Sequence, residues 1–329
     1  MNKKNISLIV ILSLIVIISS IFIFKQTGVT GEVVKESGND YFMLAHGKWV
    51  LTAPVFVAQE KGFFNDFGLD VEYKYFTSGR DDLQALLGGS ADIATVAEPP
   101  LVFGGFNNLQ VDILATFVKI PTHEKIAARK DKGINSVQDL KGKKIATLFG
   151  TRGEYFTKKF LEYNNISLEE VELINLKAPE MVTALVRGDV DAVGVWEPNL
   201  NQLKKELKDN YIEFEDADIP MTFSFVTRKD YTDKNQDKLI RFLKAIKKAN
   251  EYIVSNKEES ILIVSKYTYF DEEFLRDTWN DYTFELYLDE SVINYMNIQA
   301  QWAIDSEIVA EQEIPDYNYM IYDGLIKQI

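Results

Sequence analysis

The fold is decided by two stretches of the chain, "ALLGGSADIATVAEPPL" (residues 85–101) and "ALVRGDVDAVGVWEPNL" (residues 184–200). They align without a gap at a spacing of 99 residues, and eight of their seventeen positions are identical. Each reads as the end of a helix, an apolar strand, and a Glu-Pro turn that opens another helix. The chain therefore contains two related halves.

The segments before these stretches also correspond. The strand-like runs "VEYKYF" (71–76) and "VELINL" (171–176) precede the first and the second stretch. Strands that alternate with helices are typical of βαβ units and parallel sheets. We therefore predict an α/β fold with two lobes, each a mainly parallel sheet flanked by helices. The first lobe begins with "YFMLAH" (41–46), and the second runs from about 125 to "MTFSFVT" (221–227).

The C-terminal part of the chain, 228–329, has mostly helical periodicity. Residues 237–254 and 291–309 place apolar side chains at helical spacing. We expect this part to return to the first lobe, so that 40–125 and 226–329 form lobe I and 126–225 form lobe II. Crossings near 125 and 225 would then form a hinge.

The N-terminal 25 residues are typical of a membrane segment. The run "ISLIVILSLIVIISSIFIF" (6–24) is nineteen residues without a charge, which can span a bilayer. Lys3 and Lys4 before it favour a cytoplasmic N-terminus and an exported remainder. We predict an uncleaved anchor over 1–25 and a polar linker over 26–39. A cleaved signal with a weak site at 29–31 is the alternative, which would leave the protein secreted or periplasmic.

Composition excludes several classes of function. The chain of 329 residues has a net charge of −14, no cysteine and two histidines. The negative charge argues against nucleic acid as a partner. Without cysteine there is no disulfide, thiolate metal site or cysteine nucleophile. No phosphate-binding loop or nucleophile-elbow motif occurs either, so we expect no catalytic residues, no metal and no cofactor. Asn165 begins a glycosylation triplet of a kind that is common by chance.

Ligands of open α/β sheets bind at the carboxyl ends of the strands. Arg152 stands there, in the turn "GTRGEYF" (150–156), where a helix begins. The free N–H groups of a helix start and a guanidinium suit a carboxylate, phosphate or sulfonate. A solvated surface arginine is the alternative. Thr151 could cap this helix or offer its hydroxyl to the ligand.

Glu98 and Glu197 occupy the same place in the repeat. The helix dipole favours an acid there without any ligand, and the alternative is that one or both bind an amine or N–H donor. If Arg152 and a glutamate both face the cleft, the ligand should be zwitterionic or carry an anion and a donor. Trp49 and Trp196 could wall an apolar or ring-shaped ligand or fill the lobes.

Four stretches occur in an order that resembles the substrate-binding proteins of ABC importers. They are "PVFVAQEKGFFNDFGLDVEY" (54–73), "LQALLGGSADIATV" (83–96), "ARKDKGINSVQDLKGKKIATLFGTRGEYFTKKFL" (128–161) and "VWEPNLNQL" (195–203). The branch they resemble most is the NMT1/THI5-like one, for nitrate, sulfonates such as taurine, and thiamine-precursor pyrimidines. The resemblance covers about 41–317.

The resemblance implies a type II periplasmic-binding-protein fold. It also implies a small anionic or zwitterionic ligand clamped between the lobes, a location outside the cell membrane, and delivery to an ABC permease and its ATPase. The ligand contacts it implies are His46, Trp49, Thr52, Ser78, Gly79, Glu98, Thr151, Arg152, Tyr155, Trp196 and Glu197. The loop "AHGKWVLTAP" (45–54) and the turn at 150–153 depart from the family pattern, which leaves the substrate open.

Three other functions stay open from the sequence. A receptor for a thiamine-precursor pyrimidine would use the same cleft. An extracellular sensory domain would bind without delivering the ligand. An enzyme on the same scaffold, such as a pyrimidine-precursor synthase, would need a nucleophile and a base, or metal ligands, in the cleft.

Overall fold

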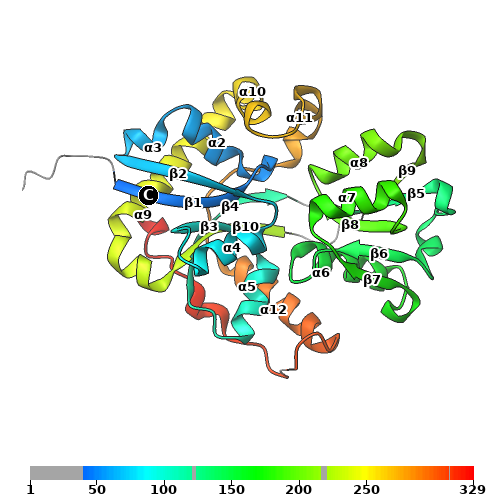
Figure 1. Cartoon of the computed structure of the whole chain (residues 1–329). Helices are drawn as coiled ribbons and strands as arrows, with labels where there is room; N and C mark the ends of the chain where they lie inside the picture. The colour runs from blue at the N-terminus through cyan, green and yellow to red at the C-terminus, as the bar shows by residue number, and fades with distance from the viewer. Residues whose placement is uncertain (1–39, 121–123, 216–220, 311) are drawn as a thin grey trace, which may run out of the picture. The chain divides into compact units, whose positions relative to one another are not determined.

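The computed structural model of the chain describes residues 40–120, 124–215, 221–310 and 312–329 (Figure 1). The predicted membrane segment 6–24 and the linker 26–39 lie outside these residues. Within the described ranges, none of the helices combines the length and the apolar character needed to cross a bilayer.

The first sheet has five strands in the order β2-β1-β3-β10-β4 (Figure 1). β1 pairs in parallel with β2 and with β3, whereas β10 runs antiparallel to β3 and to β4. β1 contains the predicted strand 41–46 and is followed by a loop that enters the candidate site. The strands are β1 (Asp40–Gly47), β2 (Leu69–Phe76), β3 (Ile93–Ala97), β4 (Val111–Ile120) and β10 (Met221–Arg228).

The second sheet repeats this arrangement in the order β7-β6-β8-β5-β9. β6 pairs in parallel with β7 and β8, and β5 is antiparallel to β8 and β9. The prediction of mainly parallel sheets is confirmed in part. The sheets are mixed, because β5 and β10, which follow the crossings between the sheets, run against the other strands of their sheets. The strands are β5 (Glu124–Arg129), β6 (Lys144–Thr147), β7 (Glu172–Asn175), β8 (Ala192–Trp196) and β9 (Tyr211–Phe214). The crossings themselves, at 121–123 and 216–220, lie outside the described residues, so the hinge and the lobe boundaries stay predictions.

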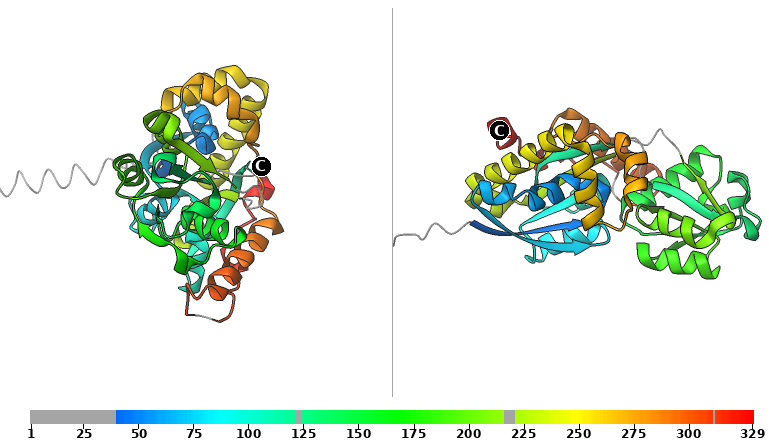
Figure 2. Two further views of the ribbon diagram at one scale, coloured as in Figure 1. Left: turned by 90° about the vertical axis from the view of Figure 1, so that its right-hand side faces the viewer. Right: turned by 90° about the horizontal axis from the view of Figure 1, so that it is seen from above.

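Helices cover both faces of each sheet (Figure 2). In β1, Phe42 and Leu44 belong to the core that includes α2, α3, α9 and α10, whereas Ala45 belongs to the core that includes α4, α5 and α12. In the second sheet, α6 lies on one face and α7 and α8 on the other. The helices are α2 (Ala53–Glu60), α3 (Phe63–Asp66), α4 (Gly79–Leu87), α5 (Glu98–Phe106), α6 (Arg152–Tyr163), α7 (Ala178–Arg187), α8 (Asn199–Leu207), α9 (Lys229–Ser255), α10 (Lys257–Tyr267), α11 (Glu272–Thr278) and α12 (Glu290–Asp305).

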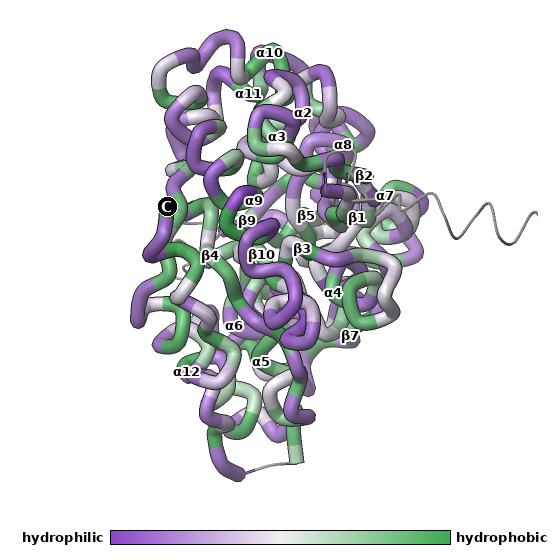
Figure 3. The backbone as a smooth tube through the Cα atoms, turned by 90° about the vertical axis from the view of Figure 1, so that its left-hand side faces the viewer, coloured by the Kyte–Doolittle hydropathy of each residue, from purple (hydrophilic) through white to green (hydrophobic). Residues whose placement is uncertain are grey.

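The helical periodicity predicted for the C-terminal part is confirmed in α9 and α12. In α9, Leu239, Leu243 and Ile246 recur at helical spacing and are fully buried. Figure 3 shows the result as a helix that carries both hydrophilic and hydrophobic colour along its length. The buried positions of α9 pack on α2 and on the first sheet.

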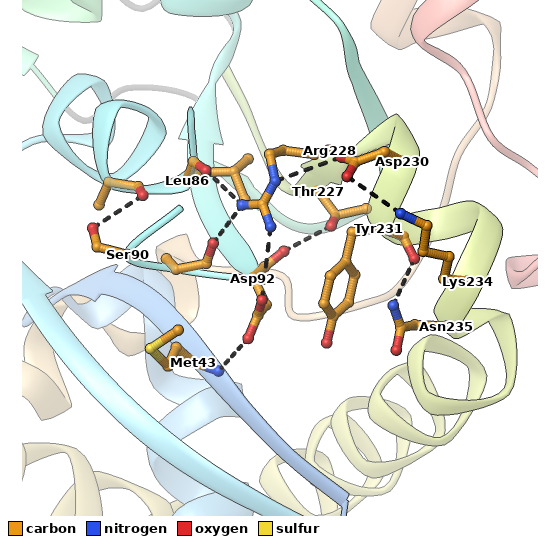
Figure 4. Close-up of polar contacts among 12 residues, drawn as sticks. Met43, Leu86, Ser90, Asp92, Thr227, Arg228, Asp230, Tyr231, Lys234 and Asn235 are labelled. Atoms are coloured by element: carbon orange, nitrogen blue, oxygen red, sulfur yellow. Dashed lines mark hydrogen bonds and ion pairs between the residues drawn. The ribbon is translucent and has the colours of Figure 1, made fainter. Parts of the chain in front are cut away.

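A polar cluster fixes the end of the first sheet that lies away from the candidate site (Figure 4). The Arg228 guanidinium, at the end of β10, donates to the carbonyl oxygens of Leu86 and Ala91 at 2.6 and 2.7 Å. It also lies 3.8 Å from the carboxylate of Asp92, which accepts a hydrogen bond from the Met43 N–H. These bonds join β10 to the turn before β3 and to β1.

The second sheet has a related cluster, in which Arg129, Leu185 and Asp191 are each 99 residues from Arg228, Leu86 and Asp92. Arg129, at the end of β5, donates to the carbonyl oxygens of Leu185 and Val186. Asp191 accepts from the Lys144 N–H at 2.9 Å, as Asp92 does from Met43. The repeat therefore extends to the side chains that hold the sheets together.

Candidate functional site

A cavity of about 40 Å³ lies where strand ends of both sheets meet. Its wall includes residues after β1, β2 and β3 of the first sheet and after β6 and β8 of the second, as expected for α/β sheets. The lining residues are Trp49, Leu51, Ser78, Gly79, Arg80, Ala97, Pro100, Glu124, Thr151, Arg152, Trp196 and Phe223.

Six of the predicted site residues line this cavity. They come from four loops, which the fold brings together. Three lie in the first half of the repeat and three in the second. The six are Trp49, Ser78, Gly79, Thr151, Arg152 and Trp196.

Trp49 forms part of the apolar wall. Its ring meets the Phe223 ring edge-on, with the ring centroids 5.6 Å apart. The ring also lies directly on Gly47, where a Cβ would come within 2.1 Å of it, so only glycine fits there. The Thr52 hydroxyl donates to the carbonyl oxygens of Gly47 and Trp49, at 2.8 and 2.9 Å. Thr52 is buried and does not line the cavity, and it holds the loop that presents Trp49.

The Arg152 guanidinium lies beside the Glu124 carboxylate, with Nε and Oε2 3.3 Å apart. Both side chains are almost completely buried, with 5% and 2% of their surface exposed. The alternative of a solvated surface arginine is therefore wrong. Burial raises the pKa of the Glu124 carboxyl, and the nearby Arg152 charge opposes that shift.

The helix start at Arg152 is capped in an unexpected way. Thr151 is the residue before α6, yet its hydroxyl donates to the carbonyl oxygen of Leu148 and makes no capping bond. Instead, the Glu154 carboxylate accepts from the Gly150 N–H at 2.7 Å. Gly150 has a φ of +71°, which favours glycine. Both hydrogen bonds therefore lie within residues 148–154, and the Thr151 hydroxyl stabilises the turn.

Glu98 is buried and does not line the cavity, although Ala97 and Pro100 beside it in the chain do. Its Oε1 accepts hydrogen bonds from both the N–H and the hydroxyl of Thr222. Its Oε2 is buried and has no hydrogen-bond partner in the part of the chain that the structure describes. Burial raises the pKa of Glu98, and the Arg152 charge opposes this. Arg152 therefore lies in the field of two buried carboxyl groups.

Glu197 does not share the environment of Glu98, although the two correspond in the repeat. Glu98 is the first residue of α5, whereas α8 begins only at Asn199. Glu197 is partly buried, accepts from the Asn201 N–H at 3.0 Å, and lines a different groove with Lys125 and Glu213. Burial raises the pKa of Glu197 to about 7.

His46 lies outside the cavity lining, fully buried among the rings of Phe56, Tyr73 and Tyr75. Its Nδ1 is 3.0 Å from the Gly47 carbonyl oxygen. Burial lowers the pKa of His46 to about 4. These contacts give His46 a structural role behind the cavity, where the resemblance implies a ligand contact.

Tyr155 supports Arg152 and does not line the cavity. The guanidinium carbon of Arg152 lies 5.4 Å from the centre of its ring. The other side of the contact is α12, where Trp302 meets Tyr155 edge-on at 4.8 Å between centroids. The helix α12, from the C-terminal part of the chain, thus packs against the first turn of α6.

The sequence analysis missed two charged residues of the lining, Arg80 and Glu124. Arg80 directly follows the predicted contacts Ser78 and Gly79, so its position was a usable signal. Glu124 begins β5 and is followed by the apolar run "IAA" (126–128). A charged residue at the start of a central strand is a signal that could have identified it. The remaining missed residues are apolar: Leu51, Ala97, Pro100 and Phe223.

The chain is similar in sequence to described proteins. The profile of the family described as "NMT1/THI5 like" matches residues 50–260. The taurine-binding periplasmic protein of Escherichia coli K12 is 27% identical over 208 residues, which are 62% of this chain and 64% of that protein.

Solved structures share the fold. The alkanesulfonate-binding protein of Xanthomonas axonopodis, bound to MOPS, superposes with a TM-score of 0.75 at 16% identity, covering 86% of this chain and 98% of that one. The periplasmic nitrate-binding protein of Synechocystis PCC 6803 superposes with a TM-score of 0.69 at 18% identity, covering 88% of each chain. The two mixed sheets with their helices are therefore the fold of periplasmic binding proteins.

Proposed function

Because this chain belongs to the NMT1/THI5-like family, we propose that it is the substrate-binding receptor of an ABC importer. Its ligand is a small anionic or zwitterionic molecule of the sulfonate, taurine or nitrate type. The observation that carries this proposal is a cavity between the two sheets that is lined by two guanidinium groups, Arg80 and Arg152. The names of the relatives that bind taurine, alkanesulfonate and nitrate support the same class of ligand.

The charges of the cavity favour a ligand that carries a donor as well as an anion. Glu124 lines the wall, and Glu98 lies behind it with one oxygen unpartnered among the described residues. An aminosulfonate would place its oxyanion near a guanidinium and its ammonium near a carboxylate. Trp49, Trp196 and Phe223 supply the apolar surface for the carbon atoms between them. A nitrate ion would leave the carboxylates unmatched.

A receptor for a pyrimidine is the second candidate, and the same aromatic wall favours it. Flat rings stack on tryptophan and phenylalanine side chains. A sensory domain would use the cavity in the same way, without delivery. In each case the protein binds its ligand without changing it, and we assign it no catalytic residue.

In the proposed mechanism the ligand is captured between lobe I (40–125 and 226–329) and lobe II (126–225). The lobes then close on the ligand and present it to a permease that an ATPase drives. Residues 6–24 would hold the receptor on the outer face of the cell membrane. Six residues are proposed as direct contacts, namely Trp49, Ser78, Gly79, Thr151, Arg152 and Trp196. Glu98, Tyr155, Thr52 and His46 would support them from behind, and Glu197 would act outside the cavity.

Thermal unfolding of the full-length chain in a mild detergent tests the proposal. The panel contains taurine, ethanesulfonate, nitrate, aminopyrimidines and dicarboxylates. A ligand at a hundred times its Kd stabilises the folded state by about 2.7 kcal/mol. We expect this shift with taurine, and we expect it to vanish in Trp196→Ala but not in Arg187→Gln, an exposed residue of α7. No shift with any sulfonate or with nitrate would contradict the proposed ligand class, and a shift with an aminopyrimidine alone would favour the second candidate.

A further inference from the structure

Arg80 joins the two sheets at the cavity. It lies in the first turn of α4, which follows β2 of the first sheet. Its Nη1 donates a hydrogen bond to the carbonyl oxygen of Phe149, in the turn between β6 and α6 of the second sheet. The two residues are 69 positions apart in the chain. One side chain thus connects two of the loops that form the cavity wall.

The turn that receives Arg80 is shaped for close approach. Gly150 follows Phe149, and a Cβ built on it would lie 3.5 Å from Arg80 Cδ and 3.7 Å from Nη1. The side chain therefore lies across the backbone of the turn. Since Gly150 also has a positive φ, a larger residue would strain the turn on which Arg80 lies.

The two guanidinium groups of the cavity differ in their charge partners. Arg152 is paired with the buried carboxylate of Glu124. Among the residues that the structure describes, no carboxylate lies within ion-pair distance of Arg80. Arg80 Nε is buried and has no hydrogen-bond partner in the same part of the chain. A buried N–H without a partner is costly, and an oxyanion bound beside it would remove that cost.

The shape of the Arg80 guanidinium allows it to bind a ligand and to hold the Phe149 carbonyl oxygen at the same time. Its Nε–H and the neighbouring Nη2 N–H form one edge, which matches two oxygens of an oxyanion. Nη1 points away from that edge and already holds Phe149. Binding a ligand on the free edge therefore does not require breaking the contact to the second sheet.

We propose that Arg80 is the specificity-determining anion contact of the cavity and couples ligand binding to the joining of the two sheets. The oxyanion of the ligand accepts from the Nε edge while Nη1 holds the Phe149 carbonyl oxygen. Arg152, which the sequence favoured for this role, also lines the cavity, but its charge is paired with the buried carboxylate of Glu124. This inference rests on the proposed function, since it assigns the anion contact of the same ligand.

Affinity measurements test the anion contact. Calorimetric titration of the full-length chain with taurine, ethanesulfonate and nitrate is compared with Arg80→Gln, Arg80→Lys and the control Arg187→Gln. Charge-assisted hydrogen bonds of this kind predict a loss of about tenfold to a hundredfold in Arg80→Gln, and a smaller one in Arg80→Lys, which keeps the charge without the fork. Arg152→Gln removes the other guanidinium and should lose less affinity than Arg80→Gln, because Glu124 already pairs with Arg152. Unchanged affinity in Arg80→Gln, or a larger loss in Arg152→Gln, would overturn the proposal.

A distance measurement tests the coupling without relying on a ligand. The sequence has no cysteine, so Leu87→Cys on α4 and Tyr163→Cys on α6, both at exposed positions, can be spin-labelled selectively. In the ligand-free protein, Arg80→Gln should lengthen or broaden the distance between the labels, and Arg187→Gln should not. Identical distances would show that Arg80 does not join the sheets.

The two readouts also separate this inference from the proposed function. If the unchanged chain binds none of the three anions, the proposed function and the anion role of Arg80 both fail. If it binds them and Arg80→Gln binds them equally well, only the assignment of Arg80 fails.

Discussion

Phe223 and Glu124 occupy equivalent positions in the two sheets, 99 residues apart in the chain. Phe223 lies opposite Ala97 across β10 and β3, and Glu124 lies opposite Trp196 across β5 and β8. Both side chains line the cavity, but one is an aromatic ring and the other a carboxylate. The two halves of the repeat therefore place an apolar side chain and a charged side chain at equivalent positions of the cavity wall. Such a cavity can orient a ligand that has one apolar and one polar end.

The pair of Glu124 and Arg152 should be essential for stability. Glu124→Gln leaves the buried guanidinium without a full countercharge, and the free energy of unfolding should fall by about 3 kcal/mol. Urea denaturation measures this loss. Glu285→Gln, which breaks the exposed pair with Lys119, is the control and should cost less than about 1 kcal/mol. Equal losses in the two variants would mean that burial adds nothing to the Glu124 pair.

Gly153 should be required for the position of Trp196. A Cβ at Gly153 would lie 2.8 Å from the Trp196 ring and 3.1 Å from Thr147 Oγ1. Overpacking of this kind costs about 1–3 kcal/mol and outweighs the roughly 1 kcal/mol that alanine gains within a helix. Gly153→Ala should therefore lower both the melting temperature and the affinity for ligand. Gly324→Ala, where the nearest atom is 3.9 Å away, should change neither, and a stabilised Gly153→Ala would contradict the packing argument.

Burial of His46 should make the fold sensitive to acid. The pKa of His46 is about 4 in the folded protein and near 6.5 in the unfolded chain. Between these values the unfolded chain binds the extra proton, so stability falls as the pH drops from 6.5 towards 4, by on the order of 3 kcal/mol. His46→Gln should reduce this slope in urea denaturation at pH 7, 6 and 5. The same slope in both proteins would mean that His46 is accessible to protons in the folded state.

Burial of Glu197 should make the folded protein less stable as the pH rises, which is the opposite of the effect of His46. Its pKa is about 7 in the folded protein and near 4.5 when unfolded, so the folded state binds the extra proton between these values. Stability therefore falls as the pH rises from 4.5 to 7, by on the order of 2 kcal/mol. Glu197→Gln should be more stable than the unchanged chain at pH 8 and similar at pH 4.5. Glu215→Gln, in the same groove but with an exposed carboxylate, is the control and should show little change at either pH.

Part of the fold that the sequence analysis missed was readable in the sequence. "RKD" occurs at 129–131 and again at 228–230, at the same spacing of 99 residues as the longer repeat. In the structure these arginines end β5 and β10, the two antiparallel strands, and hold equivalent clusters. Extending the alignment to these three residues would have predicted that the two segments are equivalent, whereas the direction of their strands comes from the pairing in the structure.

The sequence by itself determined the elements, the two related halves and the loops that carry the site. Local periodicity decides helices and strands, and parallel strands bring their carboxyl ends to one edge of a sheet. Only the tertiary structure decided which charges are paired. Arg152 meets Glu124 across 28 residues within the second half of the repeat, and Arg80 meets Phe149 across 69 residues, from one sheet to the other. A charged side chain that is buried in the interior needs a partner. No local sequence pattern specifies which residue that partner is.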